Sequence, residues 1–169
     1  MTPGQLVKWC GLGGNYKANY DRSVKTKINK DRIGVIVHDH QGLVIAVLSE
    51  GLRHWVNVDC VEAMVAFKAV QFVKDLGLEN IYLESDTTNV IKMINDPGDA
   101  ISQFGHLAHG VHDLLRRFRS TTVYHVFRKD NSVTHCLSIL TFDCVGPMIW
   151  MDEASPTLVH LILSEGSQS

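Results

Sequence analysis

Three acidic side chains stand at points of the chain where carboxylates can do chemistry. Asp21 ends an alternating run that begins at Tyr16, Glu62 lies one turn into a predicted helix, and Asp86 follows a short apolar run. Carboxylates held close together repel one another, and hard cations such as Mg²⁺ stabilise such clusters through oxygen ligands. Two such ions, about 3.5–4 Å apart, can clamp the attacking and leaving oxygens of a phosphodiester. If the fold brings them together, the three acids predict a nuclease-type site.

Hydrophobic periodicity predicts the elements that must position these acids. Alternation over the first run and short or β-branched-rich apolar runs elsewhere predict five strands: Tyr16–Asp21, Ile33–His38, Leu43–Glu50, Asn80–Glu84 and Thr121–Phe127. Helical patterns predict four helices: residues 61–76, 86–95, 103–118 and 131–142. Three successive strands favour an antiparallel meander, and strands joined through helices favour parallel pairing. We therefore expect an α/β fold with a mixed five-stranded sheet flanked by helices.

The predicted topology gives the acids a common location. Ligands of such sheets bind beyond the carboxyl ends of the parallel strands. If the first and fourth strands are neighbours, Asp21 and Asp86 meet there. Each acid also has a structural interpretation: Asp59 and Glu62 resemble a capping box, Asp86 is a candidate helix N-cap, and Asp21 is a candidate solvated charge.

Length and composition favour a single intracellular domain. The chain has 169 residues, 45% of them hydrophobic and 20% charged. We place a lead-in at residues 1–14, the folded domain at 15–146 and a C-terminal tail at 147–169. No signal peptide or membrane-spanning run is visible, and scattered cysteines suit a reducing compartment, so we expect the nucleus or cytoplasm.

Positive charge is concentrated in two parts of a chain whose net charge is -2. Residues 1–40 and 116–129 are basic, whereas residues 59–99 are acidic. Phosphate binding requires a local basic patch rather than a basic protein, so a polyanionic partner is compatible with this distribution. Two solvated faces would give the same distribution, and charge alone does not separate these interpretations.

Four segments, taken in order, resemble a ribonuclease H domain. They are "YKANYD", "DCVEAMVAFKAV", "YLESDTTNVI" and "YHVFRKDNSVTHCLS". The resemblance covers about Trp9 to Trp150 and is strongest to the plant reverse-transcriptase-like branch derived from retrotransposons. It implies the mixed sheet inferred above, and cleavage of the RNA strand of RNA–DNA hybrids with two Mg²⁺ ions.

The resemblance also implies roles for individual residues. Asp21, Glu62 and Asp86 match the first three metal-binding carboxylates of the family. His135 stands at the fourth position, and His125 falls near a histidine that assists proton transfer or product release. The resemblance further implies nucleic-acid contacts at Asn19, Arg22, Arg128 and Asn131.

Two departures from the family pattern bear on activity. Arg22 stands where the family usually has Gly, and its cation either contacts phosphate or crowds the site. His135 stands where ribonucleases H place Asp, and a neutral imidazole suits Mg²⁺ poorly. The alternative interpretation is that His135 is a histidine on the exposed side of a helix with no role at the site. We predict a monomeric hybrid ribonuclease using Mg²⁺ or Mn²⁺. The alternatives are an inactive module that binds nucleic acid or protein, and a retroelement fragment.

Overall fold

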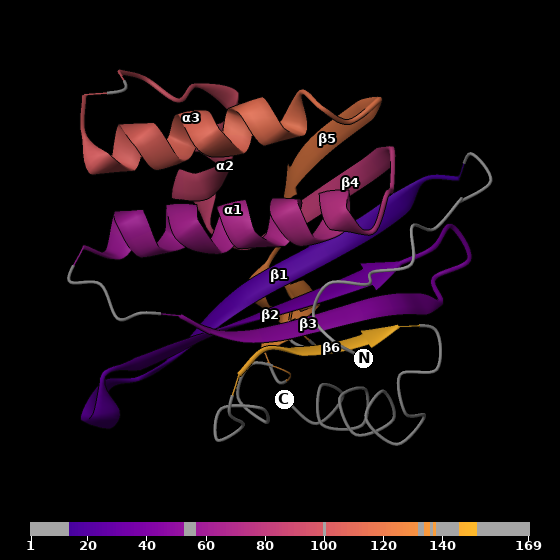
Figure 1. Ribbon diagram of the computed structural model, residues 1–169, viewed down its shortest axis with the longest axis horizontal. Helices are drawn as coiled ribbons and strands as arrows, with labels where there is room; N and C mark the ends of the chain where they lie inside the picture. Colours follow the sequence, from indigo (N-terminus) through magenta and orange to yellow (C-terminus); the bar gives the residue numbers. More distant parts are fainter. Residues whose placement is uncertain are drawn as a thin grey trace.

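A mixed sheet forms the centre of the molecule (Figure 1). The computed structural model describes residues 14–52, 57–99, 101–131, 134, 135, 137 and 146–151. The described strands are β1 (Tyr16–Lys25), β2 (Lys30–His38), β3 (Val44–Leu52), β4 (Asn80–Ser85), β5 (Ser120–His125) and β6 (Met148–Met151). The helices are α1 (Val58–Asp75), α2 (Thr88–Asn95) and α3 (Gln103–Leu115), with 3₁₀ turns η1 (Thr26–Ile28) and η2 (Arg128–Asn131).

The strand order β5-β4-β1-β2-β3-β6 confirms the predicted α/β class. β1, β2 and β3 form the antiparallel meander, and β4 pairs in parallel with both β1 and β5. The turn between β2 and β3 follows from its residue types. The Asp39 carboxylate accepts the backbone N–H groups of Gln41 and Leu43, and Gly42 adopts a φ of 81°.

The predicted strand count was wrong by one. β6 pairs antiparallel with β3 and makes the sheet six-stranded, although the sequence places residues 148–151 in a tail. Four residues after Pro147 are too few to show a clear alternation, which explains the omission. Of the predicted final helix, Thr134, His135 and Leu137 are helical, and much of the remainder lies outside the described residues.

The sheet separates a large core from a smaller one. α1 and α3 pack against each other over one face of the sheet (Figure 1). The large core includes Ala18, Tyr20, Val35, Val65, Leu83 and Val111. A second cluster consists of Ile36, Val47 and Leu137, with Trp150 packed against it. Among the described helices, none is both long and apolar enough to cross a membrane.

Asn131 fastens the C-terminal part of the fold to the central strand. Its side chain is 1% exposed, and Nδ2 donates a 2.8 Å hydrogen bond to the backbone carbonyl of Tyr20. This carbonyl immediately precedes Asp21 in β1, and His135 follows Asn131 in the chain. The bond therefore fixes the segment that carries His135 against the strand that carries Asp21.

We predict that Asn131→Ala destabilises the protein by about 1–3 kcal/mol, because the buried Tyr20 carbonyl loses its side-chain donor. Urea unfolding measures this change. Asn95→Ala, at an exposed position near the end of α2, is the matched control and should change stability by less than about 0.5 kcal/mol. Equal effects of the two substitutions would contradict the anchoring role of Asn131.

Candidate active site

Asp21 and Asp86 are brought together by the parallel pairing of β1 with β4. The register pairs Asn19 with Glu84, the last partners of the two strands. Continuing it by two residues sets Asp21 beside Asp86, where the strands part. The prediction that these strands are neighbours is thus confirmed, and their carboxyl ends form one side of the candidate site.

Glu62 reaches the same region from the second turn of α1. The helix is capped by Asn57, whose Oδ1 accepts the backbone N–H of Cys60 at 3.1 Å. The capping-box interpretation of Asp59 and Glu62 is therefore wrong. Thr87 donates from its hydroxyl to Glu62 Oε2 at 3.4 Å, which ties α1 to the end of β4.

Asp86 does not cap the helix that follows it. α2 begins at Thr88 with Thr87 as its N-cap, and Thr87 makes no side-chain capping bond. Ser85 Oγ accepts the backbone N–H of Thr87 at 3.2 Å and shapes the turn around Asp86. Within the part of the chain that the structure describes, the Asp86 carboxylate has no hydrogen bond or ion pair.

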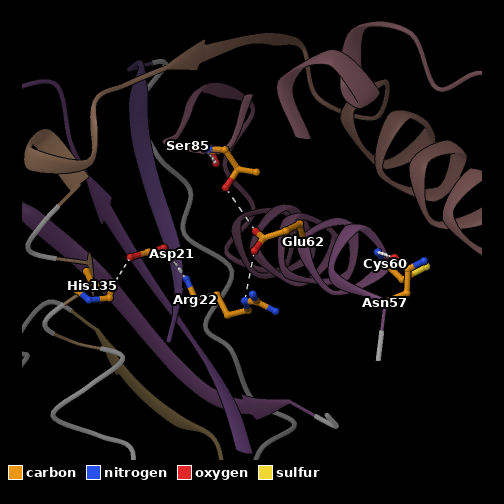
Figure 2. A network of polar contacts seen from close by, with 8 residues as sticks. Asp21, Arg22, Asn57, Cys60, Glu62, Ser85 and His135 are labelled. Carbon is orange, nitrogen blue, oxygen red and sulfur yellow. Dashed lines mark hydrogen bonds and ion pairs between the residues drawn. The ribbon is translucent and has the colours of Figure 1, made fainter. Parts of the chain in front are cut away.

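Arg22 bridges the other two acids. Its backbone N–H donates to Asp21 Oδ1 at 2.7 Å, and its guanidinium Nε lies 3.2 Å from Glu62 Oε1. Figure 2 shows Arg22 between Asp21 and Glu62. The Arg22 and Glu62 side chains are only 17% and 18% exposed, so solvent screens this ion pair less than it would on an open surface. Arg22 therefore supplies a positive charge inside the acidic cluster.

His135 lies on the other side of Asp21 (Figure 2). Its Nδ1 is 2.7 Å from Asp21 Oδ2, and its side chain is 29% exposed. The interpretation of His135 as a histidine on an exposed helix face is therefore wrong. Both Asp21 oxygens have partners: Arg22 holds Oδ1 and His135 holds Oδ2.

His125 is exposed at the end of β5 and lies close to the cluster. Its Nε2 is 3.2 Å from the backbone carbonyl of Asp86, and its ring meets that of Phe127 edge-on at 6.0 Å. Arg128, at the start of η2, is also exposed. Both side chains are therefore open to a ligand that approaches from this edge of the sheet.

Two residues expected to contact nucleic acid are buried. Asn19 is 5% exposed and donates from Nδ2 to Glu84 Oε2 at 2.7 Å. Asn131 donates to the backbone carbonyl of Tyr20, as described above. Both side chains are thus engaged inside the protein, and their contacts with nucleic acid stay predictions.

Burial and mutual repulsion shape the electrostatics of the cluster. Burial is the largest cause that raises the pKa of Asp21, and the nearby Asp86 charge raises this pKa further. The backbone N–H of Arg22 and the His135 side chain oppose the change. The pKa of Glu62 is also raised, by burial and by the charges of Asp21 and Asp86, against the Arg22 guanidinium. The three carboxylates thus interact with one another, and Arg22 offsets part of the repulsion.

The donor chemistry of the cluster fits a divalent cation, but Arg22 and His135 engage two of its carboxylates. Oxygen ligands that repel one another are the set that Mg²⁺ or Mn²⁺ stabilises. Among the described residues, however, no three His, Cys, Asp or Glu side chains are arranged as a metal-binding group. An ion would be held by Asp21, Glu62, Asp86 and His135 after Arg22 releases Glu62.

Sequence reasoning missed the polar residues that support the acids. Thr87 and Ser85 orient Glu62 and the turn around Asp86, and Glu84 is held by Asn19 and lies 3.6 Å from Lys17 Nζ. The run "ESDTT" carries the signal, since four polar residues flank Asp86 where a strand meets a helix.

Comparison with known families matches residues 19–140 to the family described as Reverse transcriptase-like. The chain belongs to this family. Comparison with curated proteins gives no match. The ribonuclease H-like fold is also that of several solved structures. RNase H1 from the halophilic archaeon Halobacterium salinarum NRC-1 is 20% identical, with a TM-score of 0.68, and the alignment covers 77% of this chain and 98% of that one.

Two further structures share the ribonuclease H-like fold. The N-terminal RNase H domain of rv2228c from Mycobacterium tuberculosis is 16% identical with a TM-score of 0.65, and the alignment covers 77% of this chain and 94% of that one. LC11-RNase H1 was isolated from compost, and one of its structures is a complex with an RNA/DNA hybrid. In that complex it is 16% identical with a TM-score of 0.56, and the alignment covers 72% of this chain and 92% of that one. At these identities the likeness establishes the fold alone.

The raised pKa of Asp21 predicts a pH-dependent gain in stability for Asp21→Asn. The folded ribonuclease H-like domain holds this proton more tightly than the unfolded chain, whose pKa is near the ordinary 3.8. The cost of ionised Asp21 is therefore absent below pH 3.8 and is fully present above the raised pKa. The unfolding free energy of the wild type should thus fall relative to that of Asp21→Asn as the pH rises from 3.8 through the raised pKa.

Urea unfolding in a chelating buffer, repeated across this pH range, measures the difference. Asp113→Asn removes a carboxylate from an exposed position on α3 and serves as the control. A difference between wild type and Asp21→Asn that stays constant or shrinks with rising pH would show that Asp21 carries no such penalty.

Proposed function

We propose that this domain binds RNA–DNA hybrids and hydrolyses their RNA strand at the Asp21, Glu62 and Asp86 cluster. One observation carries the proposal: three partly buried acids from β1, α1 and the end of β4 lie together, and burial, followed by their mutual charges, raises the pKa values of Asp21 and Glu62. Carboxylates that repel one another beyond the carboxyl ends of parallel strands suit a site that works with divalent cations.

Each residue of the cluster would have a distinct role in hydrolysis. Asp21, Glu62, Asp86 and His135 would hold the cations, and Asp86 is the carboxylate that has no internal partner among the described residues. When bound, a pair of Mg²⁺ or Mn²⁺ ions would activate water and stabilise the leaving oxygen. His125, next to the Asp86 carbonyl, is placed to move a proton at the edge of the site.

Arg22 would limit the activity of this site. Its guanidinium takes a Glu62 oxygen that a cation would otherwise bind. Cation binding therefore competes with an ion pair that is already formed and partly buried. Once released, the Arg22 side chain is placed to contact a phosphate of the hybrid, together with Arg128. We accordingly propose a slow enzyme.

A second candidate function is favoured by the same ion pair. If Arg22 retains Glu62 in the presence of divalent ions, the domain is a binding module that keeps the ribonuclease H-like fold without hydrolysis. The Arg22 guanidinium then serves as the permanent cation of the cluster. In this case hybrid binding would remain, and cleavage would be absent.

We extend the proposal to the setting of the domain. The four ordered motifs support an origin in the plant retrotransposon-derived branch, and we propose an intracellular monomer in the nucleus or cytoplasm. The proposed domain begins at residue 15 after a lead-in, and because β6 pairs with β3 we extend it from the predicted limit of 146 to Met151.

Cleavage of a labelled RNA–DNA hybrid in Mg²⁺ or Mn²⁺ tests the proposed function. We expect slow cleavage by the wild type, background from Asp86→Asn, and a rate about tenfold higher for Arg22→Ala, equivalent to about 1.4 kcal/mol of barrier. Arg22→Lys keeps a cation at this position and is the matched control, with a rate close to that of the wild type. His135→Asp, which adds a fourth carboxylate, should also cleave faster.

The proposal of hydrolysis fails if the wild type, Arg22→Ala and His135→Asp all give the Asp86→Asn background with either ion. Retained hybrid binding in that experiment would establish the second candidate function. Circular dichroism of each variant confirms that a lost rate does not reflect a lost fold.

A further inference from the structure

The hairpin between β1 and β2 carries a compact group of lysines that the cluster chemistry does not use. Lys25 ends β1, Lys27 lies in the 3₁₀ turn η1, and Lys30 begins β2. We call these three residues the lysine hairpin. Lys27 and Lys30 are exposed and Lys25 is half-buried, while Asp31, the adjacent acid, is only 2% exposed. The hairpin tip therefore presents positive charge with no exposed acid beside it in the chain.

Two of these lysines face each other across the hairpin. Lys25 and Lys30 are direct cross-strand partners in the antiparallel register. Like charges placed directly opposite each other destabilise a strand pair. Ile28, at the tip, is also 51% exposed. A polyanion that lies across the hairpin would therefore meet both lysines.

The hairpin has a defined shape. Asn29 adopts a left-handed conformation with φ of 48°, and its backbone N–H donates to the Thr26 carbonyl at 3.3 Å. Asn tolerates this conformation better than most residues. The closed turn holds Lys27 between the two strand ends and keeps the three ammonium groups on one short unit.

The hairpin lies on the same side of the molecule as the candidate active site. β1 runs on to Lys25 after its pairing with β4 ends at Asn19, and the hairpin extends away from the rest of the sheet at the lower left of Figure 1. Lys25 follows Asp21 by four residues of extended strand, or about 13 Å. This span equals roughly four nucleotides at 3.4 Å each along one strand. A duplex that is bound at the acids and runs along the end of β1 would thus reach the lysines.

From this placement we infer that the lysine hairpin is a phosphate-binding arm that holds the backbone of the hybrid about four nucleotides from the cleaved bond. The inference rests on the proposed function, because it takes the hybrid as the ligand. Phosphate contacts position a duplex without reading its sequence, so the arm would contribute affinity and register rather than base preference.

A second basic group provides the control. Arg116, Arg117 and Arg119 are exposed after α3, next to the N-terminal end of β5. Because β5 and β4 are parallel, this group lies at the opposite end of the strands from Asp86. Replacing it removes the same formal charge from the protein but leaves the proposed arm intact.

Fluorescence anisotropy of a labelled hybrid, measured in a chelating buffer over a series of salt concentrations, tests the arm without requiring cleavage. The full chain is compared with the triple variant Lys25→Ala, Lys27→Ala, Lys30→Ala and with the triple variant Arg116→Ala, Arg117→Ala, Arg119→Ala. We expect the lysine variant to bind at least tenfold more weakly. The slope of its log affinity against log salt should be flatter by about 2.7, since each of the three phosphate contacts contributes roughly 0.9. The arginine variant should bind within about twofold of the wild type, as expected for a distant group.

Three outcomes would overturn the inference. If the lysine variant keeps the wild-type affinity for the hybrid and the wild-type salt slope, the hairpin is not a phosphate-binding arm, and the proposed function still stands. Equal losses of hybrid affinity in both triple variants would show a general effect of charge. Lysine-dependent binding to phosphatidylserine vesicles, without lysine-dependent binding to the hybrid, would assign the hairpin to an anionic membrane surface. Absence of hybrid binding by the wild type would instead contradict the proposed function itself, and the arm with it.

Discussion

The ion pair between Arg22 and Glu62 is the interaction on which the charge balance of the site depends. Three carboxylates converge beside a buried strand, and burial and repulsion together raise the pKa values of two of them. Arg22 opposes this effect with its guanidinium at Glu62 and its backbone N–H at Asp21. A cluster of this kind needs positive charge, and the chain supplies some of it from within.

The topology explains why Arg22 contacts Asp21 through its backbone and Glu62 through its side chain. Successive side chains of a strand point to opposite faces, so Asp21 faces His135 while Arg22 faces α1. Asp21 and Asp86 remain in electrostatic contact because each follows the last paired residue of its strand by two positions, just where β1 and β4 separate. The same separation leaves the end of β1 paired with β2, which produces the projecting lysine hairpin. The candidate site and the proposed arm thus arise from one structural feature, the early end of β4.

Much of the site was predictable because it depends on strand order. Three short strands followed by strands joined through helices imply that Asp21 and Asp86 lie at one place. The parallel pairing of β1 with β4 confirms that the two strands are neighbours, and the Asp86 charge acts on Asp21. The direction of the Arg22 side chain was not predictable, since the sequence alone does not say which partner faces it from a helix. The burial of Asn19 and Asn131 depends on contacts with Glu84 and Tyr20, which are distant in the chain. The short strand β6 lacked a periodic signal and required the edge of β3 to form.

Thermal unfolding with and without Mg²⁺ tests most directly whether Arg22 occupies the place of a cation. In a chelating buffer Arg22→Ala should unfold at a lower temperature than the wild type, because the repulsion among the acids is no longer offset. Added Mg²⁺ should raise the midpoint of Arg22→Ala more than that of the wild type, since a ligand stabilises the state that binds it more tightly. Adding Asp86→Asn to Arg22→Ala should abolish most of this rise. Equal Mg²⁺ responses of the wild type and Arg22→Ala would contradict the competition between Arg22 and the metal.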